Sequence, residues 1–400
     1  MNKYWLLFLG VVAVVACTFF LVLFLKTGES QGISIIPSLG KVGPGYILES
    51  ALSEEDKQAI GKSHNVFDLF DLVGIVKLET TLDDFIVYAR NAFILGEYIF
   101  ILDNVQNKIY RFRQDGSFAG TIGKTGQGPG EFQRPHLLKK VFDNYLGVYC
   151  AGTGKILIYD QDGQFIMEYN PQKYAKNRIL GFNFIWERKD RLIRNGFRLF
   201  KGKEPSVANV MLNPMDKNRI IGGFGMRQTL PGNLCFKVEP STFAFNQIGD
   251  TIWYGLPFST DVELFSADGK FIKRIKNRGQ DRLQPSDFHG IQSTKSLRYR
   301  ELYNKKRKCF GIFSSQNMVC VEIGGGNFDV YSKAGELLCK DVSNDRQFPT
   351  FFTGEGNTIM SFRSHVLKSS ELINRIQAAG LELPEVTDED TCLFLFQAKY

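Results

Sequence analysis

The sequence predicts an all-β fold, a six-bladed β-propeller that follows an N-terminal transmembrane helix. The chain of 400 residues contains 35 Phe and 39 Gly, which favours short strands joined by tight turns. One hairpin pattern recurs along the chain, and an uncharged apolar run lies near its start. The hairpins predict the propeller, and the apolar run predicts the membrane anchor.

Four segments align without gaps, beginning at Ile109, Ile156, Val262 and Phe328. Each contains a turn glycine, and these are Gly116, Gly163, Gly269 and Gly335. An aromatic residue stands four positions before each glycine: Phe112, Tyr159, Phe265 and Tyr331. Two positions after it come Phe118, Phe165, Phe271 and Leu337. Asp-Gly between alternating apolar positions predicts a β-hairpin.

The spacing of the hairpins predicts the number of blades. The interval from Gly163 to Gly269 is about twice that from Gly116 to Gly163, so we expect a hidden repeat at 210–221. Strand pairs upstream of the hairpins complete units of about 40 to 50 residues, the length of a propeller blade. A last blade would combine 358–364 and 391–400 with 72–81. Pairing the two chain ends in this way would close the ring.

We expect the propeller to cover residues 71–400, with helical insertions near 288–308 and 369–380. The second insertion ends on Gly380, a common helix terminator. Residues 27–70 are predicted to be a linker, because a Gly-, Pro- and Ser-rich stretch is followed there by a polar one.

Residues 1–26 are predicted to be a membrane anchor. Residues 4–25 carry no charge and rise about 33 Å as a helix, enough for a hydrocarbon core of about 30 Å. The alternative is a lipoprotein signal, because "VVAC" at 14–17 resembles a lipobox with Cys17 as the modified residue. Both interpretations tether the chain to a membrane. The flanking lysines are too balanced to fix its orientation.

The stretch "GKTGQGPGEF" from Gly123 begins like the end of a phosphate-binding P-loop. A P-loop requires glycine at the position of Phe118 and a helix directly after Thr125. Three glycines and a proline follow instead, and they disfavour a helix. The sequence therefore predicts a loop between blades that does not bind nucleotide.

Residues 76–81, 99–135 and 383–400 resemble a family of six-bladed β-propellers from the Bacteroidetes envelope, which is similar to the NHL-repeat propellers. The most specific element is Gly126, Gly128, Pro129, Gly130, Glu131 and Phe132. The chain departs from the resemblance at Ala151-Gly152, where family members tend to carry Asp. The resemblance implies the fold and an extracytoplasmic location, but no common activity.

No catalytic, cofactor-binding or metal-binding residues can be assigned from the sequence. We interpret the scattered histidines as loop or surface residues: His64, His136, His289 and His365. Four carboxylates at strand ends would suit a divalent cation in the central channel, but capping of strands and turns is the favoured interpretation: Asp103, Asp143, Asp160 and Glu322. Seven cysteines occur without a CxxC pair, and no disulfide can be named.

Charge gives little functional information. The net charge of +7 does not predict nucleic-acid binding. The basic run 305–308 is interpreted as a solvated helix end rather than a site for lipid or glycan.

We therefore expect a monomeric binding or scaffolding module of the cell envelope, for a protein or glycan partner. The alternative is a metal-dependent hydrolase or lyase, lactonase-like, with its site in the central channel.

Overall fold

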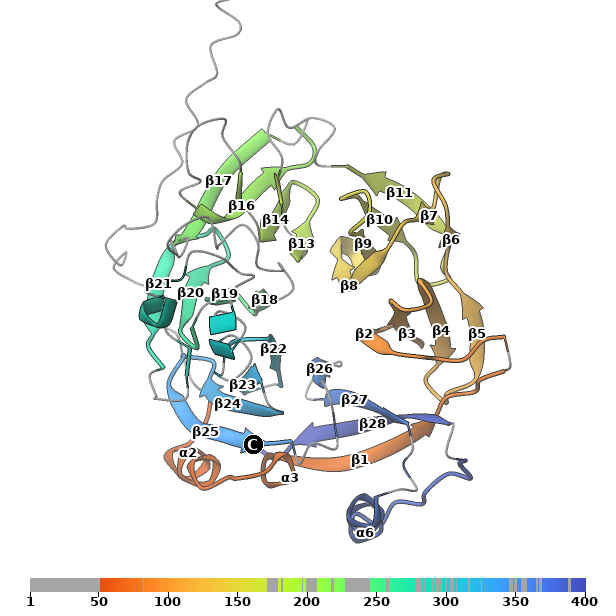
Figure 1. Cartoon of the computed structure of the whole chain (residues 1–400), viewed down its shortest axis with the longest axis vertical. Helices are drawn as coiled ribbons and strands as arrows, with labels where there is room; N and C mark the ends of the chain where they lie inside the picture. Colours follow the sequence, from red (N-terminus) through yellow and green to blue (C-terminus); the bar gives the residue numbers. More distant parts are fainter. Residues whose placement is uncertain are drawn as a thin grey trace, which may run out of the picture.

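The structure, a computed structural model, has an all-β, propeller-like fold (Figure 1). Four four-stranded antiparallel sheets and one eight-stranded sheet form a ring. Residues 51–400 are described, except 82, 171–178, 181–182, 196, 199–206, 217–218, 227–244, 257–258, 278–281, 284, 289–290, 292–296, 299–300, 303–305, 307, 316, 325, 345–347, 349–350, 354–357, 365, 367–368 and 388–389.

Each sheet runs outward from the centre of the ring. The first contains β2 (Ala89–Leu95), β3 (Tyr98–Asp103), β4 (Lys108–Arg113) and β5 (Phe118–Thr121). Another four-stranded sheet contains β18 (Phe245–Ile248), β19 (Thr251–Gly255), β20 (Val262–Ser266) and β21 (Phe271–Ile275). It is followed by β22 (Gly311–Ser314), β23 (Met318–Gly324), β24 (Asn327–Ser332) and β25 (Leu337–Ser343).

The eight-stranded sheet has two halves, each an antiparallel series of four strands. The first half is β8 (Pro135–Val141), β9 (Tyr145–Cys150), β10 (Ile156–Tyr159) and β11 (Phe165–Tyr169). The second is β13 (Phe184–Arg188), β14 (Arg191–Asn195), β16 (Val207–Asn213) and β17 (Arg219–Met226). A single parallel residue pair, Val141 with Trp186, joins the halves through β8 and β13. Smaller elements are β12 (Ile179–Leu180), β15 (Phe197–Arg198), and the 3₁₀ helices η1 (Phe142–Asn144) and η4 (Pro285–Phe288).

The closing sheet combines the two ends of the domain. It contains β26 (Phe351–Thr353), β27 (Thr358–Ser364), β28 (Thr391–Ala398) and β1 (Phe70–Lys77). β1 is antiparallel to β28, with Phe70 opposite Ala398 and Lys77 opposite Cys392. Strands from both ends of the chain therefore complete one sheet, as the sequence predicts, and the ring closes through hydrogen bonds.

The folded domain begins earlier than the predicted linker boundary at residue 70. Two short helices precede β1, α2 (Glu54–Gly61) and α3 (Val66–Leu69). Ile60, Val66 and Leu69 are fully buried in the core beside the closing sheet. The polar composition misled the prediction, because half of the residues of α2 are exposed and only Ile60 is buried. The rest of the predicted linker, 27–50, lies outside the described residues.

The four repeated hairpins have the same cross-strand packing. Phe112 lies opposite Phe118 with ring centroids 5.7 Å apart, and Phe265 lies opposite Phe271 at 5.8 Å. Tyr159 likewise faces Phe165, and Tyr331 faces Leu337. Such aromatic pairs stabilise a hairpin beyond their buried area. The hidden repeat at 210–221 falls on β16 and β17, which pair without an Asp-Gly turn.

The turn glycines of these hairpins also join neighbouring sheets. All four have positive φ, between 71° and 89°. A Cβ at Gly116 would lie 2.1 Å from the carbonyl oxygen of Lys77 in β1, and one at Gly163 would lie 2.9 Å from Ile122. Each turn thus packs against the preceding part of the ring, where no side chain fits. Both the backbone conformation and the close approach require glycine.

The predicted helical insertions are described to different extents. α6 (Ser370–Ala378) is capped by Ser369 and followed by Gly380 at φ 69°, at the predicted place. Most of 288–308 lies outside the described residues, although 297, 298, 301 and 302 are helical. No helix in the described part of the chain combines the length and apolar character needed to cross a bilayer. The expected anchor, 4–25, and Cys17 fall outside that part.

Candidate functional site

The connections between strands differ on the two faces of the ring. Because successive strands are antiparallel, connections alternate between the faces. One face carries the short hairpin turns at 114–117, 160–164, 267–270 and 333–336. The opposite face carries longer connections at 122–134, 276–310 and 365–390. We call this second surface the loop face, and the strands β2, β8, β18 and β22 begin there.

The "GQGPGEF" element lies on the loop face and is held by its own contacts. It includes the short strands β6 (Lys124–Thr125) and β7 (Glu131–Phe132), and no helix follows Thr125. The Glu131 carboxylate accepts a hydrogen bond from the Gly128 N–H at 2.8 Å and pairs with Lys124 at 3.0 Å. Gly126 donates its N–H to the carbonyl of Phe132. The lysine that suggested a P-loop is therefore part of an ion pair within the loop.

The glycines of this element permit tight packing. A Cβ at Gly126 would lie 2.0 Å from a Glu131 carboxylate oxygen, and one at Gly130 would lie 2.9 Å from Phe165. The Tyr159 hydroxyl donates to the Gly130 carbonyl at 2.9 Å. The element, with Pro129 in its turn, fixes the connection between β5 and β8 against the next part of the ring.

The four candidate carboxylates do not form one site. Asp103 is fully buried, and its two oxygens accept four backbone N–H groups, from Val87, Tyr88, Val105 and Gln106. Asp160 caps the turn before Gln164, on the face opposite the loop face. The side chain of Asp143 lies outside the described residues. Within the described ranges, no three His, Cys, Asp or Glu side chains come close enough to hold a metal ion.

Glu322 differs from these carboxylates. It lies on β23, opposite Gly311 of the inner strand β22, and a Cβ at Gly311 would lie 2.9 Å from its carboxylate. The missing side chain of Gly311 thus leaves the room that the carboxylate occupies. Burial raises the pKa of Glu322 to about 7.

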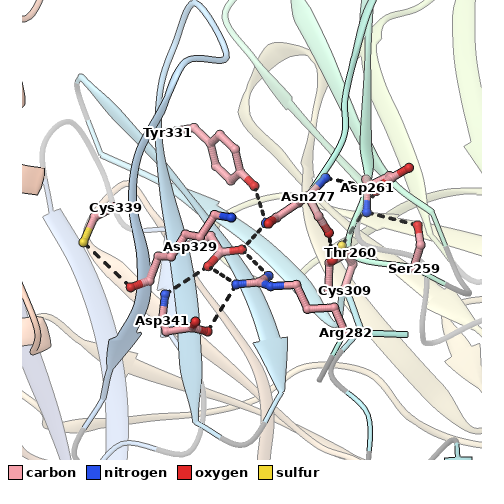
Figure 2. A network of polar contacts seen from close by, with 11 residues as sticks. Ser259, Thr260, Asp261, Asn277, Arg282, Cys309, Asp329, Tyr331, Cys339 and Asp341 are labelled. Atoms are coloured by element: carbon pink, nitrogen blue, oxygen red, sulfur yellow. Dashed lines mark hydrogen bonds and ion pairs between the residues drawn. The ribbon is translucent and has the colours of Figure 1, made fainter. Parts of the chain in front are cut away.

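A buried polar network lies between the sheet of β18–β21 and the sheet of β22–β25 (Figure 2). Arg282 donates to both oxygens of Asp329, at 2.7 and 3.0 Å, and to Asp341 at 3.2 Å. Asn277 donates to Asp329 and to the Tyr331 hydroxyl, and its backbone N–H donates to Asp261. We call these residues the Arg282 network.

The Arg282 network is nearly sealed from solvent. Arg282 is 2% exposed and Asp329 is fully buried. Burial alone would lower the pKa of Arg282, but its hydrogen bonds to Asp329 outweigh this effect and raise the pKa. The bidentate arginine–carboxylate pair and the further hydrogen-bond donors offset the desolvation cost of burying both charges. The network therefore joins two sheets.

A different group of polar side chains lies where β2 and β8 begin. The pairing of β2 with β3 changes register between Ala89 and Asn91, and the pairing of β8 with β9 changes register between Pro135 and Leu137. Arg90 and His136 are therefore bulge residues at equivalent places on neighbouring inner strands. The Arg90 guanidinium lies 3.1 Å from His136 Nε2. The Asn91 side chain accepts the N–H of Leu138 at 2.5 Å, which fixes the two strands beside the bulges.

Arg134 adds a third basic side chain to this group. It has a φ of 52°, is exposed, and stands two residues before His136. Its carbonyl accepts the N–H of Ala151, so the Ala151-Gly152 segment supplies backbone but no carboxylate beside it. Burial, reinforced by Arg90 and Arg134, lowers the pKa of His136 to about 4. We call Arg90, Arg134 and His136 the Arg90 cluster.

The sequence interpretation of the basic residues needs two corrections. His136 is partly buried and contacts Arg90, whereas His64 is exposed. The other two histidines, His289 and His365, lie outside the described residues. In the basic run, Lys306 pairs with Asp287, but Lys308 is 4% exposed and lies 4.7 Å from the Phe310 ring. The backbone N–H of Lys308 donates to the carbonyl of Ile323.

In the comparison with protein families, residues 54–217 match a family described as a domain of unknown function (DUF4934). Comparison with curated proteins gives no match. The match begins at α2, which agrees with the early start of the folded domain.

Comparison with solved structures supports the fold. A Bacteroides fragilis protein named as an exported protein is 16% identical, with a TM-score of 0.57 over 85% of this chain and 98% of its own. A DUF4221 family member from Bacteroides vulgatus is 9% identical, with a TM-score of 0.53 over 82% and 98%. A gluconolactonase from Xanthomonas campestris, 13% identical over 90% and 99%, has a TM-score of 0.47, too low to bear on activity. The chain thus shares its fold with Bacteroides propeller-like proteins, one of them named as exported.

Proposed function

We propose that this protein is a membrane-tethered, extracytoplasmic β-propeller that binds a ligand or protein partner at its loop face. The eight-stranded sheet counts as two blades, because a single parallel residue pair joins its antiparallel halves. The propeller then has six blades. The apolar run 4–25 and the structural likeness to a protein named as exported support a place in the cell envelope.

The difference between the two faces supports this proposal most directly. On the opposite face, which carries the short hairpin turns, the repeat glycines are packed against neighbouring sheets. The loop face carries longer connections and exposed apolar residues, including Phe85, Tyr88 and Val105 at 48%, 51% and 60% exposure. Buried Asp103 holds the backbone of Tyr88 and Val105 in place. A rigid scaffold with varied loops is the usual arrangement of a binding protein.

Affinity capture from membranes tests the proposal. Full-length protein is purified with its bound partners, alongside Val105→Glu on the loop face and Met215→Glu on a hairpin turn, where Met215 is 74% exposed. We expect a protein or glycan to be captured by the wild type and Met215→Glu and to be lost from Val105→Glu. Capture of nothing above background, or equal loss in both variants, would contradict the proposal.

The form of the tether has its own test. We propose an uncleaved helix, so Cys17→Ser should remain in the membrane fraction after alkaline washing, and labelled palmitate should not be incorporated. Release of Cys17→Ser, with lipid labelling of the wild type, would instead establish the lipoprotein alternative.

The hydrolase alternative depends on Glu322. Among the candidate carboxylates, its partial burial and raised pKa suit proton transfer, whereas Asp103 and Asp160 serve turns. A single such carboxylate does not make a metal site, so binding is the function that we propose. Metal-dependent lactone hydrolysis that is lost in Glu322→Gln would reverse this preference.

A further inference from the structure

The Arg90 cluster has three backbone irregularities at three basic residues. Arg90 and His136 are bulge residues, and Arg134 has the left-handed φ of 52°. A bulge turns a side chain away from the regular pleat and is common beside functional sites. A non-glycine residue in the left-handed region is strained and persists only when its surroundings hold it. At the two bulges the Arg90 guanidinium lies 3.1 Å from His136 Nε2, and Arg134 stands two residues before His136.

The charges of the cluster have no matching carboxylates in the part of the chain that the structure describes. Neither Arg90 nor Arg134 has a carboxylate partner there, and the Arg90 guanidinium contacts the His136 ring. Because a guanidinium can only donate, His136 Nε2 accepts from Arg90 and the imidazole is neutral. The Arg90 cation therefore lies beside a neutral ring at the edge of the inner strands, and the exposed Arg134 stands two residues before that ring.

This donor set fits an oxyanion. A guanidinium presents paired N–H groups that match a carboxylate or phosphate, and an anion between two arginines would remove their repulsion. Phe85 and Tyr88, each about half exposed, stand in the segment directly before Arg90. Exposed aromatic side chains in the segment that leads to Arg90 suit the apolar face of a sugar ring that bears an acid group.

Resting on the proposed binding function, we infer that the Arg90 cluster binds the oxyanion of a ligand at the loop face, between β2 and β8. The oxyanion is a carboxylate of an acidic sugar or a phosphate. The anion lies against Arg90 and Arg134, and His136 positions the Arg90 guanidinium through its Nε2.

Calorimetric titration of the full-length protein, in a nonionic polyoxyethylene detergent with chloride as the only buffer anion, tests this inference. The probes are glucuronate, inorganic phosphate and, as a neutral comparison, glucose. We expect an oxyanion probe to bind and glucose not to bind. The stronger of the two anions identifies the source of the oxyanion.

The variants are Arg90→Gln with Arg134→Gln, and a matched control, Arg113→Gln, an exposed arginine of the first sheet that precedes a hairpin turn. The double variant should bind the anion about ten-fold or more weakly, as expected for loss of charge-assisted hydrogen bonds. Arg113→Gln should bind like the wild type. If the double variant does not melt like the wild type, anion binding is measured on His136→Gln instead. That variant should also bind the anion about ten-fold or more weakly.

No binding of either anion by the wild type, or equal binding by the double variant, would overturn the inference. Affinity capture separates this result from failure of the proposed function. A partner captured equally by wild type and double variant keeps the binding function and rejects this site.

Discussion

Two arginine sites on the loop face show how differently one side chain can be used. Arg282 is 2% exposed, meets both oxygens of buried Asp329, and joins two sheets. Arg90 is partly buried, meets a neutral His136, and has no carboxylate among the described residues. A neutralised and buried cation belongs to the fold. Neighbouring cations without a counter-charge repel each other and lower the stability of the fold. Such an arrangement is expected in a protein whose ligand supplies the anion.

The largest expected effect comes from breaking the Arg282 network. Asp329→Ala leaves Arg282 buried with only the more distant Asp341, and should reduce the free energy of unfolding by about 3 to 5 kcal/mol. Asp341→Asn is the control, because Asp341 is 42% exposed on its side chain and Asn tolerates its positive φ of 59°, so this loss should be about 1 kcal/mol or less. Urea denaturation measures both. Equal losses would show that Asp329 has no special role.

Glu322 gives the reverse case, a carboxylate for which the described residues supply no paired cation. Its folded pKa of about 7 lies above the ordinary value of 4.5, so the folded state holds its proton more tightly than the unfolded state. Stability should therefore fall as the pH rises from 4.5 to 7, by at most about 3 kcal/mol. Glu322→Gln should remove this part of the pH dependence in urea denaturation series. An unchanged slope would contradict the assignment.

His136 should have the opposite slope. Its folded pKa of about 4 lies below the ordinary 6.5, because burial and the two arginines disfavour the imidazolium. The unfolded state binds the proton more readily, so stability should fall as the pH drops from 6.5 to 4, by about 1 to 2 kcal/mol after allowance for partial exposure.

Thermal unfolding between pH 4 and 7 measures this effect. His136→Gln should flatten the profile, and His64→Gln, at an exposed position, should leave it unchanged. A profile that is equally steep in His136→Gln would place the titration elsewhere.

Arg90→Gln should have the smallest effect on stability. The substitution removes a like-charge neighbour of Arg134 and leaves no buried carboxylate unpaired, so we expect a change within about 0.5 kcal/mol. Chemical denaturation beside Asp329→Ala gives the comparison in one experiment. A loss as large as that of Asp329→Ala would make the Arg90 cluster a structural joint like the Arg282 network.

The repeats made most of the fold predictable. Gly116, Phe112 and Phe118 encode a local hairpin, so their pattern survives in the sequence and predicts the strand pairs. The pairing of β1 with β28 was also predictable, because both segments have strand character and a ring must close. The start of the domain was not, since Ile60, Val66 and Leu69 are isolated apolar residues whose burial depends on strands far along the chain.

The candidate site was much less predictable. Arg90 and Arg134 carry no motif, and the bulges that bring Arg90 to His136 depend on the pairing of separate strands. Asp103 and Glu322 looked alike in the sequence, each at the end of a strand. Only the structure shows that Asp103 caps backbone N–H groups and that Gly311 leaves room beside Glu322.

The closing sheet also has a mechanical consequence. β1 is the first strand of the domain and the outermost strand of that sheet, and its hydrogen bonds to β28 complete the ring. Tension applied to the N-terminal side of the chain reaches α2, α3 and β1 before any other sheet. The ring would therefore open at this seam first, while the hairpins on either side of the Arg90 cluster remained paired.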